Sequence, residues 1–193
     1  MTTLAPTPRL ITDRLLMREW LDSDRAPYAA LNGDAEVMRH FPSMLTPQQS
    51  DEMIERMVAS WRDRGHGLWA VERQDTMEFI GFVGLAAPAW QASFTPCVEV
   101  GWRLAKQYWG HGFAPEAAHA ALAWGFENVD LPGDEILSFT TQANLNSRRV
   151  MEKIGMTYDP DDDFDHPLLP DWVDRRHVRY RINRRQFAES MAR

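Results

Sequence analysis

The sequence has one cysteine, Cys97, among its 193 residues, and it contains no long uninterrupted apolar run. A single cysteine excludes an internal disulfide and fits a reducing compartment. A membrane-spanning helix needs about 20 consecutive apolar residues. A secretion signal needs a basic start followed by an apolar stretch. Neither pattern is present, so we expect a cytoplasmic protein without a membrane partner.

A surplus of positive charge is also lacking. The chain carries 21 Lys and Arg against 28 Asp and Glu, which gives a net charge of −7. Nucleic-acid binding relies on an excess of Lys and Arg, so this balance argues against such a partner. It is compatible with a cationic or amine-bearing partner. The histidines are not spaced as metal ligands, and no metal is expected; they are His40, His66, His111, His119, His166 and His177.

The rest of the composition is typical of one globular domain. Hydrophobic residues make up 44% of the chain and charged residues 25%, which are ordinary values for a soluble protein. A chain of this length can bury a substantial core. We expect a single domain over residues 1–193, with its core at about 10–183 and a loose leader at 1–9.

The pattern of apolar and turn residues predicts alternating strands and helices. Acidic and hydroxyl side chains at 22–24 are capping candidates for the first helix, and a capping box at 46–49 opens the next. The order of elements predicts a mixed α/β fold that contains a right-handed strand–helix–strand crossover. The predicted strands are 15–20, 68–72, 79–85, 97–104, 135–141 and 177–182, and the main helices are 22–31, 47–64, 116–127 and 145–154.

The most informative segment is 98–114, where an alternating strand runs into the turn Gln107-x-x-Gly110-x-Gly112 and Pro115 then opens an alanine-rich helix. A helix N-terminus presents unpaired N–H groups and the positive end of its dipole. Glycines let a phosphate approach those groups. The dinucleotide fingerprint needs a third glycine where Pro115 stands, and no Gly-Lys-Ser/Thr of a P-loop follows. We predict a pyrophosphate cradle; an ordinary strand–turn–helix joint is the alternative.

The remaining pattern, Q/R-x-x-G-x-G/A, resembles the coenzyme A loop of the GNAT superfamily of N-acetyltransferases. Two further segments, 12–18 and 144–156, resemble the branch that includes the ribosomal-protein alanine N-acetyltransferases, with Met156 where Phe is usual. The resemblance implies a GNAT fold, with a mostly antiparallel central sheet and the crossover already described. It also implies an acetyl-CoA-dependent N-acetyltransferase that acetylates a primary amine, on a protein N-terminus or a small molecule, by direct attack. A monomer and a homodimer both remain open.

The resemblance also implies which residues bind the cofactor. Backbone N–H groups of 107–114 would bind the pyrophosphate, and the backbone of 100–104 would pair with the pantetheine arm as a strand does. An N–H near Val100 or Gly101 could polarise the acetyl carbonyl. Trp109 and Phe113 either pack on the cofactor or belong to the core edge. The expected cofactor-binding residues are Val100, Trp102, Leu104, Gln107, Tyr108, Trp109, Gly110, His111, Gly112, Phe113, Ala114, Asn144 and Ser147.

Three residues are candidates for the chemistry. Ser147 matches the family position for protonation of the leaving thiolate, although it could be a capping residue and water could relay the proton. Asn144 is an N-cap that could also bond the pantetheine amide. Glu99 is a candidate base for the amine, because burial could raise its pKa; a cross-strand ion pair is the alternative. His166 and His177 are rival bases, since histidine has a suitable ordinary pKa.

Two other functions remain possible from the sequence. One is an acyl-CoA-binding module without turnover. The other is an adaptor that binds an acidic partner through a basic strip over 175–185. Alternation places Arg179 and Arg181 on one strand face, which we expect to be exposed to solvent, and we expect the acidic run 159–165 to be a solvated loop. Trp20 and Trp172 could border the acceptor cleft.

Overall fold

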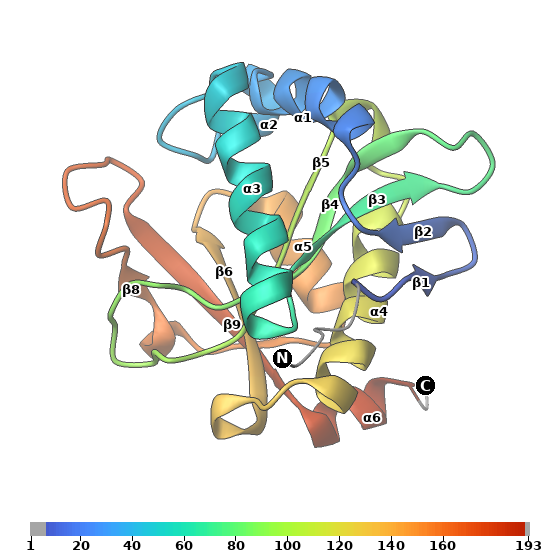
Figure 1. The fold of residues 1–193 in the computed structure, drawn as a ribbon. Helices are drawn as coiled ribbons and strands as arrows, with labels where there is room; N and C mark the ends of the chain where they lie inside the picture. Colours follow the sequence, from blue (N-terminus) through green and yellow to red (C-terminus); the bar gives the residue numbers. More distant parts are fainter. Residues whose placement is uncertain (1–6, 192–193) are drawn as a thin grey trace.

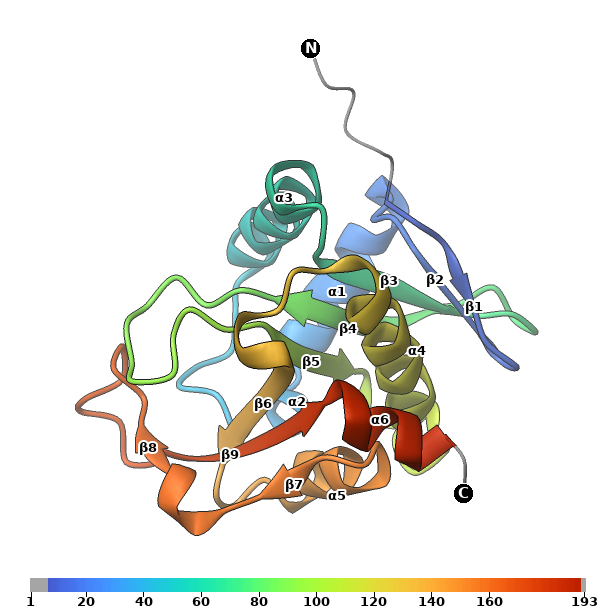
Figure 2. The same ribbon diagram turned by 90° about the horizontal axis from the view of Figure 1, so that it is seen from below.

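The computed structural model describes residues 7–191, which form one mixed, mostly antiparallel sheet with flanking helices (Figures 1 and 2). The strand order is β1-β2-β3-β4-β5-β6-β9-β7, with β8 paired to β9. The strands are β1 (Leu10–Ile11), β2 (Leu15–Arg18), β3 (Leu68–Arg73), β4 (Phe79–Ala86), β5 (Glu99–Leu104), β6 (Glu135–Thr141), β7 (Thr157–Tyr158), β8 (Phe164–Asp165) and β9 (Arg176–Asn183). The helices are α1 (Arg25–Asn32), α2 (Ala35–Met38), α3 (Pro47–Arg64), α4 (Phe113–Asn128), α5 (Leu145–Lys153) and α6 (Arg184–Met191).

The predicted fold class is confirmed, including the crossover. Every strand pair is antiparallel except β5–β6, which α4 connects. The helices cover both sides of the sheet (Figure 2). Val83 and Leu85 of β4 belong to the core cluster that contains α4, whereas Phe82 belongs to a second cluster formed with α1, α2 and α3. The crossover places the start of α4 at the carboxyl end of β5.

The helix boundaries follow their capping residues. The capping box of Thr46 and Gln49 is formed, and α3 ends at Gly65 in the left-handed region. The prediction that Pro115 opens the alanine-rich helix is wrong. That helix begins at Phe113, with Gly112 as its N-cap. Proline is tolerated there because the first-turn N–H groups of a helix have no partner inside the helix.

Two other boundaries differ from the prediction. The strand expected from Cys97 begins at Glu99. Residues 1–6 of the predicted leader lie outside the described residues. Within its remainder, the carbonyl of Pro8 accepts a hydrogen bond from Trp69 Nε1 at 2.8 Å. The start of the folded core is therefore tied to β3. In the range 7–191 no helix is long and apolar enough to cross a membrane.

Asp24 stands at the N-cap position of α1, as predicted, but its side chain makes no capping bond to that helix and accepts the Leu21 N–H at 2.8 Å instead. Asp24 is buried and accepts two hydrogen bonds from the Arg18 guanidinium, at 2.7 and 2.9 Å. Arg18 also donates to Glu72 at 2.8 Å. A buried arginine needs such partners, because an unpaired charge away from water is costly. This ion triad fixes the entry of α1 against β2 and β3.

The acidic run 159–165 is only partly a solvated loop, because Asp159, Asp161 and Asp165 are exposed but 162–164 are half-buried. Arg179 and Arg181 do not form the expected solvent face. The side chain of Asp162 is only 13% exposed and pairs with both arginines. Asp165 pairs with Arg175 at 3.2 Å and with Arg176 at 3.5 Å. Two carboxylates of the acidic segment thus pair with four arginines of the basic strip. Arg184 and Arg185 pair with Asp134 and Glu189 instead. The surface that the adaptor interpretation requires is therefore partly occupied by internal ion pairs.

We predict that Asp24→Asn lowers the free energy of unfolding by about 2–3 kcal/mol, because the buried Arg18 loses its bidentate partner. Asp22→Asn is the matched control, since the Asp22 side chain is 98% exposed and surface pairs contribute little. Urea unfolding followed by tryptophan fluorescence measures both. Equal effects of the two substitutions would contradict the role of the ion triad.

Candidate active site

A cavity of about 620 Å³ opens where β5 and β6 separate. These parallel strands share one register pair, Glu99 with Leu137. Beyond it, Gly101 to Leu104 line one wall of the cavity and Ser138 to Thr140 line another. The start of α4 closes one end, and the loop after α2 closes another. The parting of the strands leaves backbone groups of β5 available to an extended ligand.

The start of α4 has the features of the predicted cradle. Gly110 and Gly112 line the cavity with φ angles of 79° and 82°, in the left-handed region that favours glycine. Within the described residues, no backbone N–H from Gly110 to Ala114 donates a hydrogen bond. Five donors at a helix N-terminus are thus free to bind an anion.

The N-terminal hairpin braces this cradle. Arg14 donates from Nη1 to the carbonyl of His111 at 2.9 Å and from Nε to Glu116 at 2.7 Å. The other carboxylate oxygen of Glu116 accepts from the Thr12 hydroxyl at 2.6 Å and from the Arg14 N–H at 2.9 Å. The segment 12–18 and the glycine turn, far apart in sequence, therefore form one structural unit.

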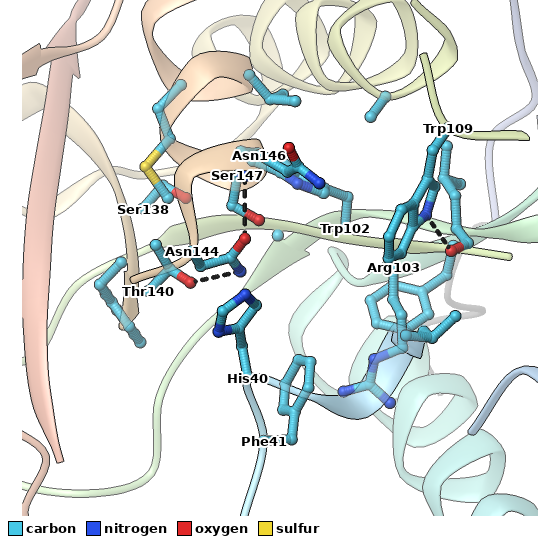
Figure 3. Close-up of a pocket in the computed structure, with 18 of the residues that line it drawn as sticks. His40, Phe41, Trp102, Arg103, Trp109, Ser138, Thr140, Asn144, Asn146 and Ser147 are labelled. Carbon is cyan, nitrogen blue, oxygen red and sulfur yellow. Dashed lines mark hydrogen bonds between the residues drawn. The ribbon is translucent and has the colours of Figure 1, made fainter. Parts of the chain in front are cut away.

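The start of α5 places Asn144 and Ser147 in the cavity (Figure 3). Asn144 caps the helix, because its Oδ1 accepts from the Ser147 N–H at 3.2 Å. Its Nδ2 donates to the Thr140 hydroxyl at 2.9 Å. The Ser147 hydroxyl makes no hydrogen bond within the described residues and faces the cavity (Figure 3). Capping thus explains Asn144, and it leaves the Ser147 hydroxyl available to a ligand.

Glu99 also lines the cavity, at the point where the strands part. Its carboxylate makes no ion pair among residues 7–191, so the predicted alternative of a cross-strand ion pair is wrong. Burial raises the pKa of Glu99 to about 8, because a charged carboxylate is disfavoured away from water. The group is therefore mostly protonated at neutral pH and loses its proton in a mildly basic solution.

His166 and His177 line the same cavity, with ring centroids 5.2 Å apart. Burial lowers the pKa of both rings, so both are neutral at pH 7. His177 Nδ1 lies 2.8 Å from the carbonyl of Arg175. A carbonyl only accepts, so Nδ1 carries the proton and Nε2 is left as an acceptor. His166 Nδ1 instead accepts from the Leu168 N–H at 3.3 Å. Of the two, His177 has the better tautomer for a base.

Most of the predicted cofactor-binding residues lie on the cavity, but three do not. Val100 is fully buried, so it can contribute only backbone groups. Gln107 and His111 are exposed and do not line the cavity. Trp172 lines it, whereas Trp20 packs against Tyr28 and Phe79 instead. The lining residues that were predicted are Glu99, Trp102, Leu104, Tyr108, Trp109, Gly110, Gly112, Phe113, Ala114, Asn144 and Ser147.

Trp109 and Phe113 were each predicted either to pack on the cofactor or to belong to the core edge, and the structure places them differently. Trp109 donates from Nε1 to the carbonyl of Leu104 at 2.8 Å and presents its ring to the cavity (Figure 3). Phe113 is buried in the core and lies under the Arg14 guanidinium, 4.7 Å from it. Phe113 is therefore chiefly a core residue, whereas Trp109 is available to a ligand.

Sequence reasoning missed two residues that the fold brings to the cavity. His40, in the turn after α2, lies beside Asn144 and Ser147 (Figure 3), and its Nδ1 is 3.4 Å from the Thr141 hydroxyl. Arg103 lines the cavity on the face of β5 opposite Trp102. Arg103 had a sequence signal, a charged residue within an otherwise apolar strand. His40 had none, because its contacts are about a hundred residues away in the chain.

The fold thus brings a cavity to a helix N-terminus with free backbone N–H groups, an arrangement suited to a ligand that carries phosphate. Comparison with known proteins agrees. Residues 14–157 match the acetyltransferase (GNAT) domain. The chain is 32% identical over 151 residues to the uncharacterized protein YkkB of Bacillus subtilis (78% of this chain, 86% of that protein). It is 30% identical over 195 residues to the FsC-acetyl coenzyme A-N(2)-transacetylase of Aspergillus fumigatus (96% of this chain, 80% of that protein).

Solved structures share the fold. An acetyltransferase from Agrobacterium tumefaciens superposes with a TM-score of 0.74 at 26% identity, over 95% of this chain and 99% of that one. The ribosomal-protein-S5-alanine acetyltransferase from Vibrio fischeri gives a TM-score of 0.67 at 16% identity, over 91% and 96%. The chain belongs to the GNAT family of acetyltransferases, and it is an acyltransferase that uses acetyl-CoA.

Proposed function

We propose that the protein transfers the acetyl group of acetyl-CoA to a primary amine by direct attack of the amine on the thioester. The observation that carries this proposal is Glu99, a half-buried carboxylate without an ion-pair partner in the described chain, beside the parted strands. The single thiol supports direct attack. Cys97 does not line the cavity, and burial raises the pKa of its thiol to about 11, so it is a poor nucleophile.

For donor binding, the free N–H groups of Gly110 to Ala114 would hold the pyrophosphate. The backbone of Gly101 to Leu104 would pair with the amides of the pantetheine arm, because this edge of β5 has lost β6 as its partner. A backbone N–H near Val100 or Gly101 would polarise the acetyl carbonyl. These interactions would place the thioester between Glu99 and Ser147.

For the proton transfers, Glu99 in its charged form would accept a proton from the ammonium of the acceptor. His177 Nε2 is the rival base, and water a further one. Ser147 would donate its hydroxyl hydrogen bond to the departing thiolate, with the proton supplied directly or through water. Asn144 fixes the first turn of α5, and with it the position of Ser147.

An amine acceptor agrees with the name of one relative. The Aspergillus fumigatus protein is named an N(2)-transacetylase, so its acetyl group goes to a nitrogen.

The test of the proposed function is release of free coenzyme A thiol from purified protein, acetyl-CoA and a panel of primary amines and peptides with free N-termini. We expect release that depends on the acceptor. Tight coenzyme A binding without such release would support an acyl-CoA-binding module, and no binding at all would refute the donor site.

The cradle predicts the effect of a glycine substitution. Gly112→Val should weaken coenzyme A binding at least about tenfold, because a β-branched residue at a positive φ distorts the turn that aligns the N–H groups. Gly133→Val is the matched control, since Gly133 has a φ of 70° in an exposed turn that does not line the cavity. Isothermal titration calorimetry measures both. An unchanged dissociation constant for Gly112→Val would refute the cradle.

The raised pKa of Glu99 predicts a pH dependence. The charged carboxylate is the proposed base, so kcat should rise with pH, reach half of its maximum near pH 8 and level off only in more basic solution. Glu99→Gln should lower kcat at pH 7 at least about tenfold and remove this rise, without weakening coenzyme A binding. His177→Gln should preserve the rise. If the rise of kcat with pH persists in Glu99→Gln and is lost in His177→Gln, then His177 is the base.

A further inference from the structure

Arg103 is a buried cation on the cavity wall. Its exposed fraction is 8%, and it lies on the face of β5 that also carries Glu99 and Gly101. Figure 3 shows its guanidinium beside Phe41, at one side of the cavity. The group lies 4.1 Å from the ring centroid of Phe41 and 5.5 Å from that of Phe82. These rings stabilise a cation but neutralise no charge.

The guanidinium is held in place by one chain of hydrogen bonds. Its Nη1 donates to Asn32 Oδ1 at 2.6 Å. The Asn32 Nδ2 donates to the Ser50 hydroxyl at 3.0 Å, and that hydroxyl donates to the carbonyl of Thr46 at 3.0 Å. Asn32 and Ser50 are fully buried, so the amide cannot turn away. The guanidinium is therefore fixed before any ligand arrives.

Most of the hydrogen-bonding capacity of Arg103 is unused. A guanidinium has five N–H donors, and among residues 7–191 only the bond to Asn32 satisfies one of them. The Nε–H is buried without a partner. An unsatisfied buried donor is unfavourable, and it is more so on a charged group. The free donors form the fork that binds a carboxylate through two hydrogen bonds.

The other well-buried arginines of the described chain show what is missing. Arg18 has Asp24 and Glu72, and Arg179 has Asp162. Arg103 has no carboxylate within 4 Å among residues 7–191. The nearby acid on α2, Glu36, pairs with Lys106 at 3.4 Å. The anion that would compensate Arg103 must therefore come from a molecule in the cavity.

We propose that Arg103 binds a carboxylate on the acceptor, so that the substrate is a small primary amine that also carries a carboxylate. The proposal rests on the amine acetylation proposed above. Glu99 and Arg103 are four positions apart on one strand face, about 13 Å between Cα atoms at ~3.3 Å per residue. The amine at Glu99 and the carboxylate at Arg103 are thus several bonds apart, which favours ω-amino acids over α-amino acids.

The test compares amines that differ only at the far end: 6-aminohexanoate with hexylamine, and 4-aminobutanoate with butylamine. We expect the native enzyme to prefer each carboxylate, with a ratio of kcat/KM values above about 10. Arg103→Gln should reduce this ratio at least about tenfold, and Arg103→Lys should restore part of it. Arg62→Gln is the control, because Arg62 is exposed on α3 and does not line the cavity.

A binding measurement keeps the proposal testable if the Arg103 variants fail to fold. Native enzyme saturated with coenzyme A should bind hexanoate in calorimetry, and hexanoate should compete with hexylamine in the assay. Equal kcat/KM values for the paired amines, or no binding of hexanoate, would overturn the carboxylate site and leave amine acetylation standing. A loss of coenzyme A affinity in Arg103→Gln at an unchanged ratio would assign Arg103 to the donor instead. Acetylation of no amine would refute the underlying function.

Discussion

The site depends on one constraint, the parting of two parallel strands after a single residue pair. β5 and β6 meet at Glu99 and Leu137, and they diverge beyond it. The divergence leaves one edge of β5 without a strand partner and opens the cavity that α4 and α5 border. Backbone groups without partners inside a protein are unfavourable, so the gap is suited to a ligand that can pair as a strand does.

Buried charged residues of the framework have partners of opposite charge, whereas the ionisable residues of β5 that line the cavity do not. Arg18 and Arg179, which lie in the framework, each have a carboxylate partner from another element. Glu99 and Arg103, which line the cavity, have no partner of opposite charge among the described residues. An unpaired arginine and a carboxyl group with a raised pKa are tolerated where function requires them, because the rest of the fold supplies the stability. The contrast supports the proposed role of this face of β5.

Much of the fold could be predicted from local signals. The capping box at Thr46 and the strand predicted over 135–141 gave boundaries close to the structure, because short-range chemistry decides them. The predictions failed where distant contacts decide. The Asp24 side chain pairs with Arg18 and makes no capping bond to α1, and Asp162 pairs with two arginines of β9. In the site, the glycine turn and α5 were predictable from motifs, whereas His40 and the free charge of Arg103 emerged only from tertiary packing.

The brace between the N-terminal hairpin and α4 has a consequence for electrostatics. Glu116 lies in the first turn of α4, close to the free N–H groups, where a negative charge would compete with a phosphate for the same positive end of the helix. Thr12 and Arg14 engage both of its oxygens. The hairpin thus supplies the counterion of Glu116 beside the proposed donor site, without lining the cavity. Two segments a hundred residues apart therefore act together: one offers free N–H groups to an anion, and the other holds the nearby carboxylate.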